Sequence, residues 1–77
     1  MSLRIESHIM NLNAQAEYHE NLAWELLIEE DPHLEAMPKQ DIHGMYGLPP
    51  HIQPLVNQAK QYRRTAAYYR RTLEVYA

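Results

Sequence analysis

The chain has 77 residues, of which 45% are hydrophobic and 22% are charged, with two glycines and no cysteine. This composition is typical of one small folded domain; it excludes disulfide bonds, and no apolar run approaches the roughly 20 residues of a membrane-spanning helix. The net charge of −3 hides a division, because residues 1–31 carry one arginine against seven carboxylates, whereas residues 52–77 carry five basic residues against one glutamate. We expect these segments, at −6 and +4, to attract each other.

The first residues predict where the protein resides. One early arginine is followed by no apolar stretch of secretory length, so we expect no signal peptide. Together with the absence of cysteine, this favours a cytoplasmic location.

Residues 4–30 are predicted to form the first helix. Apolar, small or aromatic side chains recur there at alternating intervals of four and three, the spacing of a heptad seam. The seam residues are Ile5, Ile9, Leu12, Ala16, His19, Ala23 and Leu26. Asp31 and Pro32 should end this helix, because proline disfavours the α conformation of the residue before it.

Residues 32–49 form a linker that we expect to be partly helical. Pro32 and Pro38 suit the first positions of short helical turns, and Gly44 and Gly47 suit turns. The linker is too apolar for a solvated loop, with Leu34, Met37, Ile42, Met45, Tyr46 and Leu48. We therefore predict that it folds back over Trp24 and Ile28 and closes a small core.

The second helix is predicted over residues 51–76, after Pro49 and Pro50. Its seam has spacings of three and four without a break. The seam residues are Ile52, Leu55, Ala59, Tyr62, Ala66, Tyr69, Leu73 and Tyr76. Aligned antiparallel, facing residues of the two seams have numbers that sum to 81 or 82, which pairs Ala16 with Ala66 and Ala23 with Ala59. The sequence therefore predicts one all-α domain over 1–77, an antiparallel two-helix hairpin that associates into a larger helical bundle.

Five histidines raise the possibility of a metal site. Only Glu30 and His33 have the Glu-x-x-His spacing of carboxylate-bridged metal bundles, and Pro32 breaks the helix between them. We therefore predict no metal and no cofactor. His19, on the seam, is expected to bond to the hydroxyl of Tyr62, with a pH-sensitive role as the alternative.

The sequence offers few residues or motifs suited to catalysis. It carries neither a glycine-rich phosphate loop nor a nucleophile elbow, and a two-helix hairpin offers no deep pocket. We predict that the protein is not an enzyme and takes no small-molecule substrate, with a metal-dependent bundle enzyme as a remaining alternative.

The basic second helix carries the predicted partner-binding residues, since arginine and tyrosine most often anchor interfaces. They are Lys60, Arg63, Arg64, Tyr68, Arg70, Arg71 and Val75. In projection Arg63 and Arg70 flank the seam, where bridges to Glu20 and its neighbours would hold them, while Lys60, Arg64 and Arg71 point away.

The predicted function is that of a non-enzymatic protein-interaction module: an adaptor, a small chaperone-like subunit or an inhibitor. Outward apolar residues such as Met10 and Tyr68 suggest that another protein or a second copy covers them. The alternative is a nucleic-acid-binding regulator that contacts phosphates through the same arginines, although a pI of about 5.9 lies below the basic range usual for such proteins.

Overall fold

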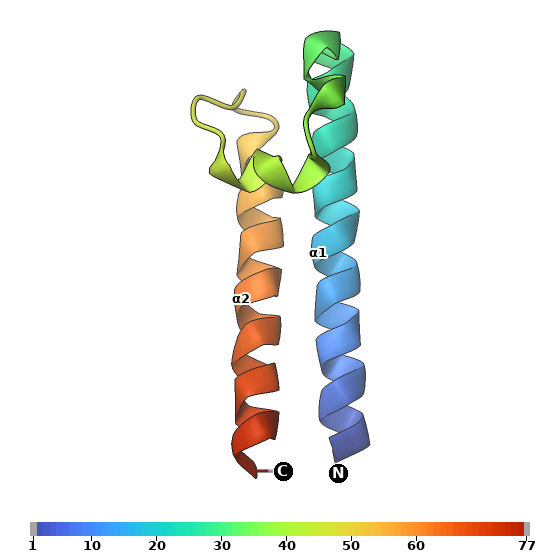
Figure 1. Ribbon diagram of the computed structural model, residues 1–77, viewed down its shortest axis with the longest axis vertical. Coiled ribbons are helices and arrows are strands. Elements are labelled where there is room, and N and C mark those ends of the chain that lie inside the picture. Colours follow the sequence, from blue (N-terminus) through green and yellow to red (C-terminus); the bar gives the residue numbers. More distant parts are fainter. Residues whose placement is uncertain (1, 77) are drawn as a thin grey trace.

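The computed structural model describes the backbone of residues 2–76 and the side chains of residues 4–74. Two long helices, α1 (Ser2–Glu30) and α2 (Gln53–Tyr76), are joined by two short 3-10 helices, η1 (Pro32–Ala36) and η2 (Lys39–Gly44). The long helices lie side by side and run in opposite directions, so the start of α1 and the end of α2 lie at one end of the molecule (Figure 1). The predicted all-α hairpin with a partly helical linker is therefore confirmed.

Prolines set the limits of the helices. Asp31 donates the last helical hydrogen bond of α1, to the carbonyl of Leu27, and Pro32 then opens η1. α2 begins at Gln53, two residues later than predicted, because Pro49 and Pro50 precede a turn rather than the helix itself. Pro54 takes the first turn of α2 instead, where its missing N–H needs no partner.

Alanines bring the two helices together along the middle of the seam. Ala16, Ala23 and Ala59 are fully buried and Ala66 is nearly so. Toward the open end, Ile9 and Leu12 form a small cluster with Ala66. Tyr62, Tyr69, Ile5 and Leu73 flank this cluster and are only half-buried. The predicted alanine levels thus lie in the helix interface, while the Tyr76 and Val75 side chains lie outside the described residues.

The closed end has a third layer, which the linker supplies. Ile42 and Leu48 are buried there against a cluster formed by Ala23, Leu27, Ile52 and Val56. Trp24 packs against this cluster, as predicted, but Leu27 rather than Ile28 enters it. Likewise Val56 is buried more deeply than the seam residue Leu55. The linker covers one flank of the seam, so residues on that flank become the core.

Candidate functional site

The buried carboxylate of Glu20, on α1, bonds to side chains of both α2 and η2. The side chain of Glu20 is 8% exposed and lies between α1, α2 and η2. Its Oε1 accepts a 2.7 Å hydrogen bond from Arg63 Nη2, and its Oε2 accepts one of 3.2 Å from Arg63 Nε. Arg63 also donates to Asn13 Oδ1 at 3.3 Å. The predicted bridge between Arg63 and Glu20 is therefore present, and it is bidentate.

The linker is fastened to the same carboxylate. His43 of η2 donates from Nε2 to Glu20 Oε2 at 2.6 Å, and Lys39 at the start of η2 donates to Asn21 Oδ1. His43 Nδ1 is buried without a hydrogen-bond partner. This arrangement could not be predicted from the sequence, because nothing in the heptad pattern of α1 or α2 indicates where a linker histidine will lie.

The carboxylate is held in its charged form. Burial raises the pKa of Glu20, but hydrogen bonds and charge from Arg63 and His43 outweigh this, so the pKa lies below its usual value near 4.5. The hydrogen bond with Glu20 in turn raises the pKa of Arg63. Arg63 therefore contributes to the fold through this ion pair, while 44% of its side chain stays exposed.

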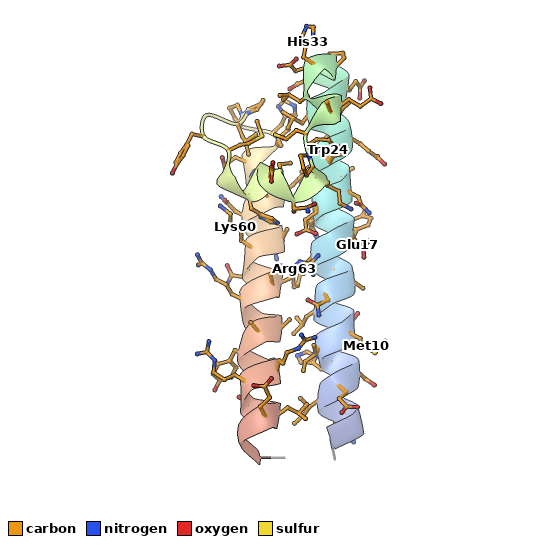
Figure 2. The ribbon with its side chains drawn as sticks, in the orientation of Figure 1. Met10, Glu17, Trp24, His33, Lys60 and Arg63 are labelled. Atoms are coloured by element: carbon orange, nitrogen blue, oxygen red, sulfur yellow. The ribbon has the colours of Figure 1, made fainter. Side chains whose placement is uncertain are left out.

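A shallow open hollow of about 580 Å³ lies beneath η2 on this side of the hairpin. Basic side chains from the linker and from α2 line it, facing acidic ones from α1. The residues concerned are Lys39, Lys60, Arg63, Arg64, Glu17 and Glu20. Figure 2 shows Lys60 on α2, Glu17 on α1 and Arg63 directed between them. The hollow combines both charges and is open to solvent, so it can receive a polar side chain of a partner.

The outward side of α2 carries a basic stripe formed by Lys60, Arg64, Tyr68 and Arg71, spaced four, four and three residues apart. Arg64 and Arg71 are exposed, and Tyr68 is 66% exposed. Among the described residues, none of these three cations forms a salt bridge. The predicted bridge from Arg70 to the acids of α1 is likewise not found there, although Arg70 and Glu6 line the same shallow hollow.

The histidines have structural partners rather than a shared ligand. His19 donates from Nδ1 to the carbonyl of Gln15 at 2.7 Å, and its ring lies 5.5 Å from that of Tyr62. The predicted bond to the Tyr62 hydroxyl is not found among the described residues, where His19 bonds instead to a carbonyl one turn earlier on its own helix. His51 pairs with Glu30 at 2.8 Å. Within the described part of the chain, no three side chains of the metal-binding types come together.

Among the described residues, no helix combines the length and the apolar character needed to cross a membrane. Comparison of the chain with protein-family models, with curated proteins and with solved structures gave no match. The function must therefore be argued from the surfaces of the hairpin.

Proposed function

We propose that the protein is a non-enzymatic interaction module, an adaptor, small chaperone-like subunit or inhibitor, that binds an acidic segment of another protein through the basic stripe of α2. The observation that carries the proposal is that Lys60, Arg64 and Arg71 form no salt bridge with any described residue and share the outward side of α2 with the exposed ring of Tyr68. Arginine and tyrosine anchor interfaces because they combine a large contact area with directional hydrogen bonds.

The fold itself explains why this stripe faces outward. Arg63 is held at the hairpin by Glu20, whereas the exposed Arg64 lines the rim of the same hollow and forms no salt bridge among the described residues. Glu20 therefore neutralises Arg63, while the basic stripe of α2 keeps its positive charge. An acidic partner would supply the charges that α1 does not, and it would be steered toward α2 by attraction.

Binding of nucleic acid through the same arginines is the alternative. Stacking on bases needs exposed aromatic rings, and it would rest on Tyr68, since Tyr62 and Tyr69 are half-buried between the helices. The low pI of the chain also argues against nucleic-acid binding. We therefore favour a protein partner.

The test is native purification of the tagged full chain from its source cells, with the same substitution made on each helix. Arg64→Glu should release the bound protein, whereas Arg4→Glu, which reverses an exposed arginine of α1, should retain it. Equal retention by both variants, or no retained protein, would refute the proposal. A retained nucleic acid whose affinity falls steeply with salt would establish the alternative.

A further inference from the structure

The side of the hairpin opposite the linker carries two groups of aromatic rings. The ring of His19 contacts those of Tyr18 and Tyr62, with centroids 5.3 and 5.5 Å away. A second group joins His8, Tyr69 and Tyr68, with centroids 4.9 and 5.6 Å apart. Each group spans both helices. We call the surface formed by these six residues the aromatic face: His8, Tyr18, His19, Tyr62, Tyr68 and Tyr69.

The heptad positions of the aromatic face carry no formal charge between its two ends, while Arg4 lines a shallow hollow together with His8 and Tyr69 at the open end. Between residues 8 and 22, the heptad series through His8, Tyr18 and His19 contain no Asp, Glu, Lys or Arg. Between residues 58 and 72, the same is true of the series through Tyr62, Thr65 and Tyr68. Most charges near the seam lie on the linker side instead. Depletion of charge with enrichment in tyrosine is the composition of an interface core.

The exposed area of the hairpin is larger than a single compact domain of this size requires. A folded monomer of 9.1 kDa exposes about 4,900 Å² by the scaling of surface with mass. The hairpin exposes 5794 Å², an excess of about 900 Å². The view in Figure 1 has a silhouette of 45 by 21 Å, and its rear side is the one the linker leaves uncovered. A standard interface buries about 800 Å² per partner, so one covered face accounts for the excess.

The opposite net charges of the two helices favour a second copy of this chain as the partner that covers the aromatic face. A two-fold axis parallel to the helices places the acidic α1 of one hairpin against the basic α2 of the other, in both contacts at once. A two-fold axis across the helices would place acid on acid and base on base, which is unfavourable. With the first arrangement the aromatic faces meet and both linkers stay outside. We propose that a second copy of this chain packs on the aromatic face and forms a four-helix bundle with both linkers at the same end.

This inference stands apart from the proposed function, which uses the outward stripe of α2. Tyr68 lies at the boundary of the two surfaces, whereas Tyr18 belongs to the aromatic face alone. Tyr18 is 62% exposed, so its replacement leaves the core of the hairpin intact. Met10, which is 72% exposed on the linker side of α1, provides a matched control.

The experiment measures the solution mass of the purified full chain by light scattering over a dilution series, with helix content followed by circular dichroism. We expect twice 9.1 kDa for the wild type and for Met10→Glu. Tyr18→Glu and Gln15→Glu each place a carboxylate on the face that the dimer buries and should raise the dimer dissociation constant about tenfold or more while the helices persist. A wild-type mass of 9.1 kDa up to millimolar concentration would overturn the proposal, as would dissociation by Met10→Glu but not by Tyr18→Glu.

The direction of the two-fold axis can be tested separately, by measuring the distance between spin labels on the two linkers. The chain lacks cysteine, so a single spin label can be attached at Tyr46→Cys, a side chain that is 98% exposed in the linker. The proposed bundle places the two labels closer together than the 45 Å length of the hairpin. A separation longer than this in a dimer would show linkers at opposite ends and would overturn the proposed symmetry.

Discussion

Replacing Glu20 by glutamine should destabilise the hairpin by about 2 kcal/mol at neutral pH. The carboxylate accepts three hydrogen bonds, two from Arg63 and one from His43. A glutamine that keeps the bond to Arg63 Nη2 turns its NH₂ group toward Arg63 Nε and His43 Nε2, which are donors as well. Two charge-assisted bonds at roughly 1.5–3 kcal/mol each are then lost or weakened. The total is reduced because the side chain of Arg63 is 44% exposed, so water replaces part of its bonding.

Thermal unfolding followed by circular dichroism checks this value, and a loss of 2 kcal/mol corresponds to a drop in Tm of roughly 10 °C for a domain of this size. The pKa of Glu20 is lowered in the folded state, so its contribution is complete above its usual value near 4.5 and disappears as the pH falls through the folded pKa. The difference between wild type and Glu20→Gln should therefore shrink in acid. Glu17→Gln, an exposed position one turn earlier, is the control and should stay within about 0.5 kcal/mol. A constant difference from neutral to strongly acidic pH would refute the reasoning.

Two further predictions concern packing and backbone conformation. Ala59→Leu and Ala66→Leu should each cost about 1–3 kcal/mol, because both alanines are buried between the helices, while Ala67→Leu on the exposed side should be close to neutral in the same urea titration. Gly47 has a φ of 72°, so Gly47→Ala should cost about 1–2 kcal/mol, whereas Gly44→Ala, whose added Cβ meets nothing within 4 Å, should change the free energy of unfolding by less than about 0.5 kcal/mol. Neutral leucine variants at both seam positions would contradict the close approach of the helices, and equal effects at the two glycines would contradict the strained turn.

Local pattern was enough to predict the two helices and their antiparallel arrangement. The heptad spacing identified the alanine levels, and opposite charge at the seam edges identified the pair of Arg63 and Glu20. These features depend only on the period of a helix and on one facing partner.

The core residues and contacts that the sequence did not predict depend on the path of the linker. Leu27 and Val56 enter the core because η2 covers their flank, and His43 reaches Glu20 only once that path is fixed. Helical periodicity contains no information about a third layer contributed by a non-periodic segment. The bond from His19 to Gln15 was not predicted for a different reason. It runs along one helix, whereas the prediction paired His19 with the residue facing it across the seam.

We propose that this protein acts by association with another protein or with a second copy of itself. The most direct test is the mass of the protein released from its own cells under native conditions, measured by light scattering on the unfractionated complex. We expect a mass above 9.1 kDa that falls when residues of the basic stripe of α2 or of the aromatic face are substituted. A single 9.1 kDa species, free of other proteins at every concentration, would contradict it.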